Sequence, residues 1–412
     1  MIMKRTLFYP ILTFASLAAV TLSAAAPAKP AAASAGDWPC YRGPNRNGIV
    51  DRSFTLLPDG AKKLWEVHVG EGNGGIAVAG NRLYMGSPAP EPGLICLDAA
   101  SGKEVWHAPI DQWGMSATPS VADGRVYALA SKDVPRACCL DAATGHILWE
   151  RPLVKSSEER QYGHSGSPVL WQDMVFLNAG GGAALKKDTG EPVWVHEGYA
   201  GLATPVVFSW KNKPCVAFFG GDRLIARDAR SGRELFQIPW KTDLGVNACD
   251  PIIFGEKMFL CSDYGFGRAL YDFSSGEPKL LWEVVKRGGH AFSSGFWHDG
   301  HIYCFTPNGF VCLDPATGEP RWEDGSGGSA LLVGDKCLRI RSRGELVIAR
   351  VSPAGFEKLE SVELGMTEIK NAPSYSNGRL FVRNEKGRVV CLQIGTPAAP
   401  AAPVKSSGKN SR

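Results

Sequence analysis

The chain has 412 residues, of which 44% are hydrophobic and 21% are charged, a composition typical of folded proteins and not of disordered ones. Its formal net charge of +4 arises at the ends, since residues 37–395 hold 39 basic and 41 acidic side chains, a balance of −2. The basic surface of a nucleic-acid-binding protein is therefore missing, and we expect no nucleic-acid partner.

The first residues have the layout of a secretory signal peptide. Lys4 and Arg5 precede an apolar stretch from Leu7 to Leu22, which is followed by small residues. A retained membrane anchor is the alternative, but the stretch contains Pro10 and is short for a membrane span. We expect residues 1–25 to be removed, with cleavage near Ala25 or Ala28. The mature protein is then periplasmic or secreted, and it is not an integral membrane protein.

Two further segments precede the main body. Residues 26–36 form a spacer rich in proline and alanine, which favours an extended, mobile chain. Residues 37–62 contain Trp38 and Tyr41 among arginine, proline and glycine, and leaving these aromatic rings in water is unfavourable. We therefore predict an ordered lead-in segment that packs on the body.

From Lys63 onward a repeat of about forty residues sets in. Each copy ends in a bulky apolar residue, which we call the anchor. The anchors are Trp65, Trp106, Trp149, Trp194, Phe236, Trp282, Trp322 and, weakest, Leu359. Eight copies of this period are typical of a β-propeller.

A predicted β-hairpin accompanies each anchor. Asp123-Gly124, Asp299-Gly300 and Asn377-Gly378 are two-residue turn signals between alternating apolar runs. The eight hairpins span residues 76–85, 118–129, 167–177, 205–218, 251–260, 295–305, 330–340 and 373–382. Each hairpin supplies two strands, and the strand before the anchor turn and the strand that contains the anchor supply two more. The sequence therefore predicts an all-β, eight-bladed propeller of four-stranded antiparallel blades over residues 63–395.

The two ends of the repeat array complement each other. The last copy stops after a third strand near Ile394, while the first begins with an isolated strand at residues 63–67. Pairing these strands closes the ring and removes a free sheet edge. We expect residues 396–412 to be a disordered tail.

The most regular part of each copy is the turn at Leu140–Trp149. Asp141 can accept hydrogen bonds from backbone N–H groups two and three residues on, and Gly145 can adopt the left-handed backbone that closes the turn. The tryptophan then offers a large apolar face to the neighbouring blade. We predict structural, blade-docking roles for Asp98, Trp106, Asp141, Gly145, Trp149, Trp194, Trp282, Asp314 and Trp322.

Eleven cysteines are an odd number for an exported protein, so at least one thiol is unpaired. Four of them occupy equivalent positions in different blades, which lie far apart, and we interpret these as small buried apolar residues. They are Cys96, Cys139, Cys312 and Cys391. Cys138 and Cys139 are adjacent in a predicted strand, where neighbouring side chains point to opposite faces, so we expect two free thiols.

The least regular residues are those that enter the first strand of each blade. This strand lies nearest the propeller axis, so these residues ring one mouth of the channel, where diverse polar and aromatic side chains suit ligand binding. The candidates are Trp113, Tyr162, His164, Asn247, Asp250, His290, Lys370 and Asn371. A hydrated channel without a ligand is the alternative. No catalytic residues and no metal ligands are evident.

The Asp-x-x-Thr/Ser-Gly-x-x-x-Trp element resembles the repeat of the pyrroloquinoline-quinone-like β-propeller family. The resemblance covers residues 63–394, and the length and blade number are similar to those of outer-membrane protein assembly factor B-like scaffolds. It implies a non-catalytic scaffold that binds a protein or a small ligand on a propeller face, without a cofactor. The chain lacks a lipid-anchor cysteine at the end of its signal, which is a departure from that group.

Two alternatives remain. The quinoprotein alcohol dehydrogenases of the same family imply a periplasmic oxidoreductase with pyrroloquinoline quinone and calcium, towards which Asn247 and Asp250 supply only a fragment of a calcium site. A secreted glycan-binding or glycan-active protein would use Trp113, Tyr162 and Tyr199 as stacking platforms.

Overall fold

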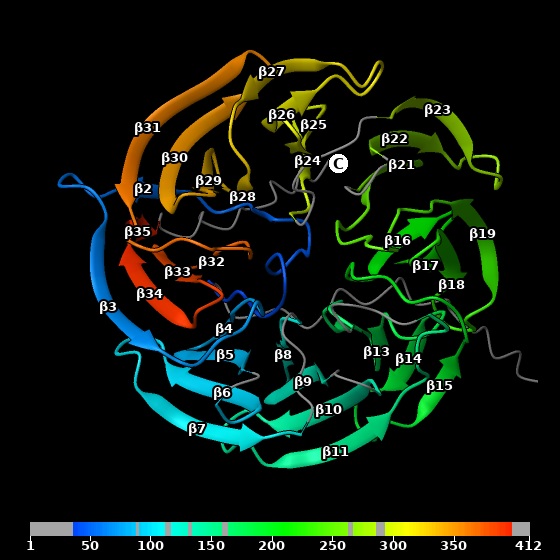
Figure 1. Ribbon diagram of the computed structural model, residues 1–412, viewed down its shortest axis with the longest axis horizontal. Coiled ribbons are helices and arrows are strands. Elements are labelled where there is room, and N and C mark those ends of the chain that lie inside the picture. The colour runs from blue at the N-terminus through cyan, green and yellow to red at the C-terminus, as the bar shows by residue number, and fades with distance from the viewer. Residues whose placement is uncertain are drawn as a thin grey trace, which may run out of the picture.

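The protein is a closed ring of eight β-sheets around a central channel (Figure 1). The computed structural model describes residues 36–87, 90–111, 117–130, 134–158, 164–262, 267–285 and 293–397. The predicted signal peptide, most of the spacer and residues 398–412 lie outside these ranges. The described residues form strands and turns, and none of their segments is a helix of the length and apolarity that spans a membrane.

Seven blades are continuous in sequence, and each runs from an inner strand at the channel to an outer strand at the rim. Blades 1 and 2 comprise β4 (Ala77–Ala79), β5 (Arg82–Ser87), β6 (Gly93–Asp98), β7 (Glu104–Pro109), β8 (Ser120–Ala122), β9 (Arg125–Ala130), β10 (Arg136–Asp141) and β11 (Ile147–Pro152). Blades 3 and 4 comprise β12 (Val169–Trp171), β13 (Met174–Leu177), β14 (Ala183–Lys186), β15 (Pro192–Val195), β16 (Val206–Trp210), β17 (Lys213–Phe219), β18 (Arg223–Asp228) and β19 (Glu234–Pro239).

The remaining blades repeat this order. Blades 5 and 6 comprise β20 (Ile252–Phe254), β21 (Lys257–Ser262), β22 (Gly267–Asp272), β23 (Lys279–Val284), β24 (Phe296–His298), β25 (His301–Thr306), β26 (Gly309–Leu313) and β27 (Pro320–Asp324). Blades 7 and 8 comprise β28 (Gly328–Val333), β29 (Lys336–Arg341), β30 (Glu345–Ser352), β31 (Gly355–Glu363), β32 (Ser374–Ser376), β33 (Arg379–Arg383), β34 (Arg388–Gln393) and β3 (Lys62–His68). The predicted fold class and all eight hairpins are confirmed.

The ring closes where the two ends of the array pair. β3 is the outer strand of blade 8 and runs antiparallel to β34, with Trp65 opposite Cys391. A second contact between the ends lies beside it, because β2 (Phe54–Leu56) pairs with β35 (Gly395–Pro397). The predicted closure is confirmed, and the ordered chain extends two residues into the segment that we expected to be a disordered tail.

Neighbouring blades join through the anchor tryptophan of one blade and the turn glycine of the next. A Cβ atom added to Gly145 would lie 2.6 Å from the ring of Trp106, so only a glycine lets the indole lie on this turn. The Trp106 indole N–H also donates to the carbonyl oxygen of Ala142 at 3.2 Å. The same indole-to-carbonyl hydrogen bond is made by Trp65, Trp149, Trp194, Trp282 and Trp322.

In most blades an aspartate holds the loop that carries this glycine, whereas Lys186 stands at the equivalent position in blade 3. The Asp141 carboxylate accepts hydrogen bonds from the N–H groups of Ala143 and Thr144 and from the Thr144 hydroxyl, at 2.8–3.0 Å. The Thr144 hydroxyl makes the largest contribution to lowering the pKa of Asp141, since all these donors favour the charged form. Gly145 has φ 75°, the left-handed backbone that the sequence predicts.

Blade 7 departs from the pattern. Strand register places Glu360, opposite Ile348, at the anchor position, so the prediction of Leu359 is wrong by one residue. The sequence period points to Leu359 because that residue is apolar, whereas the anchor position of this blade holds a glutamate. The Glu360 carboxylate accepts a 2.7 Å hydrogen bond from the Ala61 N–H, which links blade 7 to the segment that leads into β3.

The joint between blades predicts a difference between two glycines with the same backbone. Gly145 and Gly124 have φ values of 75° and 71°, but an added Cβ at Gly124 meets nothing within 4 Å. We expect Gly145→Ala to lower the free energy of unfolding by about 1–3 kcal/mol more than Gly124→Ala, because only the former displaces Trp106. Urea unfolding of both variants measures this difference, and equal losses would rule out a stabilising joint at this turn.

Candidate functional site

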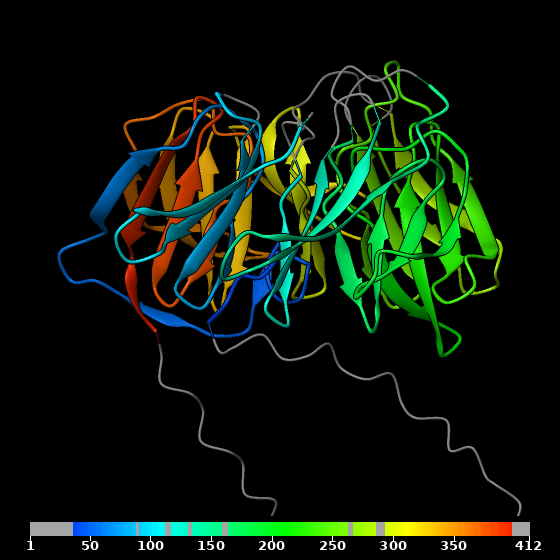
Figure 2. The same ribbon diagram turned by 90° about the horizontal axis from the view of Figure 1, so that it is seen from below.

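The predicted lead-in segment does not lie on the outside of the body but enters the central channel (Figures 1 and 2). Trp38 is 2% exposed and exchanges two backbone hydrogen bonds with Val78 of the inner strand β4. Further along, β1 (Ile49–Val50) runs parallel to β28, the inner strand of blade 7. The segment therefore contacts blades 1 and 7, and Trp38, one of the two aromatic residues predicted to pack on the body, is buried there.

Arg42 fixes the segment to the opposite wall. Its guanidinium lies 3.5 Å from the Asp250 carboxylate at the entry to blade 5 and also donates to the carbonyl oxygen of Gly295 in blade 6. Both charged side chains are buried. Desolvation raises the pKa of Asp250 to about 6, although Arg42 and the Thr204 N–H oppose this rise. The ion pair thus joins the lead-in segment to the ring in a place that water hardly reaches.

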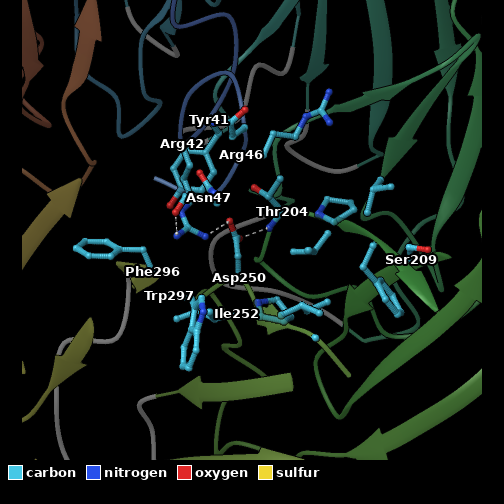
Figure 3. Close-up of a pocket in the computed structure, with 18 residues that line it drawn as sticks. Tyr41, Arg42, Arg46, Asn47, Thr204, Ser209, Asp250, Ile252, Phe296 and Trp297 are labelled. Carbon is cyan, nitrogen blue, oxygen red and sulfur yellow. Dashed lines mark hydrogen bonds and ion pairs between the residues drawn. The ribbon is translucent and has the colours of Figure 1, made fainter. Parts of the chain in front are cut away.

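A cavity of about 420 Å³ lies between the lead-in segment and the inner strands of blades 4, 5 and 6. Figure 3 shows Arg42 and Arg46 on one side of the cavity, Ser209 on a second side and Trp297 on a third. Apolar side chains such as Ile252 line the space between them. We call this the blade 4 cavity. It combines an apolar wall with two arginines and one carboxylate.

A larger cavity of about 1220 Å³ lies on the other side of the lead-in segment, over blades 1, 2, 3 and 8. Its lining includes Asp51 and Arg52 of the lead-in and Asp123 and Asp173 in the turns of the inner hairpins. Arg46 lines both cavities and separates them. We call this second space the lead-in cavity. Both open on the face from which the inner hairpin turns project.

The structure brings few of the predicted channel-mouth residues together. Asn247 is fully buried, and its amide donates to the carbonyl oxygens of Gly220 and Trp240 and accepts from the Ser262 hydroxyl. Asp250 is held by Arg42, and His164 is buried at 6% exposure.

The other candidates are dispersed. Lys370 is exposed and forms a 2.8 Å ion pair with Glu385, while the backbone carbonyl of Asn371 accepts a hydrogen bond from Ser329. Trp113, Tyr162 and His290 lie outside the described residues. Tyr199, a predicted stacking platform, packs on Gly221 and Gly245. Of the candidates that the structure describes, only Asp250 lines a cavity given above.

All eleven cysteines lie within the described residues, where they are buried and form no disulfide. Cys138 and Cys139 follow one another in β10, where burial raises the pKa of the two thiols to about 12 and about 11. Cys96, Cys139, Cys312 and Cys391 each lie opposite an anchor tryptophan. These thiols are therefore small core residues, as the sequence predicts.

The sequence also matches a family model. The model described as outer membrane protein assembly factor BamB matches residues 53–138 and 129–324, which together span more than half of the chain. The chain belongs to this family of PQQ-like propellers. No curated protein matches the sequence.

Solved structures of such PQQ-like propellers share the fold. BamB from Moraxella catarrhalis is 16% identical with a TM-score of 0.61, over 81% of this chain and 98% of that one. The quinohemoprotein alcohol dehydrogenase from Comamonas testosteroni is 14% identical with a TM-score of 0.62, over 89% and 82% of the two chains. The enzyme ADHIIG from Pseudomonas putida HK5 is 14% identical with a TM-score of 0.59, over 90% and 82%. At these identities the likeness concerns the fold alone.

Asn247 and Asp250, the predicted fragment of a calcium site, do not form a calcium site among the described residues. The described residues contain no group of three or more carboxylate, histidine or thiol side chains arranged to hold a metal ion. The predicted fragment of a calcium site is occupied by protein groups, since Asn247 binds three neighbours and Asp250 pairs with Arg42. Calcium needs six to eight oxygen ligands, and this pair supplies none that is unengaged.

The residues that sequence reasoning missed are Arg42 and Arg46 of the lead-in segment and the inner strand of blade 4. Both arginines have positive φ values, 62° and 56°, which is uncommon for residues with a side chain. A signal for them exists in the sequence, because the lead-in is dense in arginine, proline and glycine. Their partners are not visible there, since Asp250 is 208 positions from Arg42.

The buried ion pair predicts a pH-dependent cost of removing Arg42. In Arg42→Met the pKa of Asp250 in the folded protein rises further above its value of about 3.9 in the unfolded chain. The folded protein therefore loses stability as the pH rises and the buried Asp250 ionises. We expect a loss of about 3–5 kcal/mol at pH 8 and a smaller one at pH 5, measured by urea unfolding. The double variant Arg42→Met/Asp250→Asn should lose this pH dependence. A penalty equal at both pH values would contradict the assigned pair.

Proposed function

We propose that this protein is an exported, non-catalytic scaffold that holds a protein partner on the face where the lead-in segment lies. The observation that carries this proposal is the lead-in cavity, whose volume of about 1220 Å³ exceeds the usual range for a small-molecule site. Its lining mixes carboxylates and basic side chains, which suits the polar rim of a protein interface. Membership of the BamB-like family supports the same role, with a periplasmic location.

The joints have the same geometry from blade to blade, which supports a rigid binding platform. Six anchor tryptophans hydrogen-bond to the next blade, and the lead-in segment connects blades across the channel. Such a ring changes shape little, so a partner would meet a preformed surface. Binding to it avoids the entropic cost of ordering the site.

Site-specific cross-linking in the periplasm tests the proposal. A photoreactive side chain at Asp173, which lines the lead-in cavity, should capture a defined partner. The same group at Leu148, which is 45% exposed on the outer rim of blade 2, is the matched control and should capture at least tenfold less. Capture at Leu148 alone, or at neither position, would refute a partner on the lead-in face.

A quinone-dependent oxidoreductase is the second candidate, favoured by the two dehydrogenase structures that share the fold. The scaffold proposal predicts no saturable binding when the purified protein is titrated with pyrroloquinoline quinone and calcium. Absorbance of bound quinone after gel filtration measures this. A stoichiometric bound quinone that requires calcium would favour the oxidoreductase instead.

A further inference from the structure

The inner hairpin of blade 4 has five cross-strand residue pairs, more than in every other blade except blade 7, where β28 and β29 form six. In blades 2, 3, 5 and 8 a proline stands three residues before the end of the inner strand. In blade 4 the corresponding proline, Pro205, stands five residues before the end of β16, and Val207 takes the place of the proline. Because proline has no N–H, only the blade 4 strand in this group offers a backbone donor at that position.

Strand register shows where the backbone groups of β16 point. Lys211 and Asn212 both have positive φ and form the two-residue turn, so Trp210 and Lys213 are the hydrogen-bonded pair that closes the hairpin. Hydrogen-bonded and non-hydrogen-bonded pairs alternate along an antiparallel ladder. Ser209 lies opposite Pro214, which cannot donate, and Val207 lies opposite Val216. The N–H and C=O groups of Val207 and Ser209 therefore face away from β17, towards the channel.

The lead-in segment uses the equivalent groups in other blades. Val78, at the position of Ser209 in blade 1, bonds Trp38 through both its N–H and its carbonyl. The equivalent backbone groups of blades 2, 3 and 7 also bind the lead-in, through Val121 to Pro39, Leu170 to Arg46 and Leu332 to Gly48. Within the described ranges, no residue hydrogen-bonds to the channel side of Val207 or Ser209. The lead-in thus covers this strand edge in blades 1, 2, 3 and 7, and within the described ranges blade 4 keeps its edge open, as do blades 5, 6 and 8.

The open edge of β16 faces the blade 4 cavity, which also contains a positive charge. Residues 205–209 all line it, so the open edge of β16 forms one wall. On the opposite wall, Arg46 donates to the carbonyl oxygen of Leu170 but has no carboxylate partner among the residues described. Asp250 already pairs with Arg42, which leaves Arg46 as the excess positive charge. The aromatic stack of Phe254 on Trp297, with ring centroids 3.7 Å apart, borders the same space.

We propose that β16 accepts an extended peptide segment of a partner protein as an added strand, with a carboxylate of that segment paired to Arg46. This proposal rests on the scaffold function above and names the chemistry of its partner. Main-chain hydrogen bonds supply affinity in this mode of recognition, and pockets for alternate side chains supply selectivity. The lead-in segment is the internal example, because it already binds the neighbouring inner strands through its backbone.

A labelled peptide tests the strand addition directly. The probe is a fluorescein-labelled pentapeptide amide that alternates valine and threonine around one central aspartate, and we expect saturable binding by fluorescence anisotropy. The same peptide with alternate amides N-methylated on the edge that meets β16 should bind at least tenfold more weakly. Equal binding of the two peptides, or no binding of either at millimolar protein, would overturn the proposal.

Two variants of one residue separate backbone from side chain. Ser209→Pro removes the side-chain hydroxyl and a backbone N–H that points away from β17, at a position that tolerates proline on an edge strand, and should weaken peptide binding about tenfold. Ser209→Ala keeps the N–H and should bind as the wild type does. Equal binding by the two variants would contradict the added strand. If Ser209→Pro fails to fold, the N-methylated peptide still decides the question.

The charge is tested with a double exchange. Replacing the peptide aspartate by asparagine should weaken its binding to the wild-type protein about five- to tenfold. The same replacement should not change binding to the Arg46→Gln variant. An unchanged effect in Arg46→Gln would exclude the assigned ion pair. Benzoate, as a small carboxylate, should not displace the peptide at equal concentration. Displacement would indicate a small-molecule site, and self-association that blocks the peptide would indicate a second copy as occupant; both would overturn the proposal.

The proposed function and this inference fail in different ways. Capture of a partner at Asp173 without peptide binding would leave the scaffold in place and exclude β16 as its docking strand. Peptide binding without capture at Asp173 would support β16 as a peptide-binding strand but exclude a partner at the lead-in cavity.

Discussion

The structure depends on one contact that recurs around the ring, the indole of an anchor tryptophan lying on the turn glycine of the next blade. Gly145 cannot carry a Cβ there without meeting Trp106, and the Asp141 carboxylate holds the turn that presents it. Since this joint recurs between most blades, it makes the ring rigid. Because its residues are nearly the same in each blade, they cannot single out one binding site on the ring. Function must therefore come from positions where the blades differ.

The lead-in segment creates such a difference. The ring has pseudo-eightfold symmetry, but the lead-in is one stretch of chain without that symmetry, so it cannot contact all inner strands equally. It pairs with β28 and Val78 on one side and reaches Asp250 through Arg42 on the other. Among the described residues, the lead-in leaves the inner strands of blades 4, 5, 6 and 8 without such a hydrogen bond, and of these four blades blade 4 has the longest inner hairpin. The asymmetry of the segment and the length of β16 thus converge on one cavity.

The sequence predicts the architecture well because a propeller repeats local signals. Paired turn residues such as Asp123-Gly124 and the regular anchor spacing suffice to place eight hairpins and the closing strand. The anchor of blade 7 is misplaced because Glu360 stabilises its joint through a carboxylate, which an apolar period does not reveal. The candidate site is poorly predicted, since Arg42 and Asp250 are paired only by the folded ring. The two extra residues after Pro205 are visible in the sequence, but their meaning depends on knowing which strand edges the lead-in segment covers.

Hydrogen exchange of single backbone amides tests the central claim, that blade 4 keeps an open inner edge for a partner. In the free protein the amides of Val207 and Ser209 should exchange rapidly, while those of Val121 and Leu332, which bind the lead-in segment, should be protected. When a captured partner is bound, Val207 and Ser209 should become protected as well. Protection of these two amides in the free protein, or rapid exchange in the complex, would contradict this account.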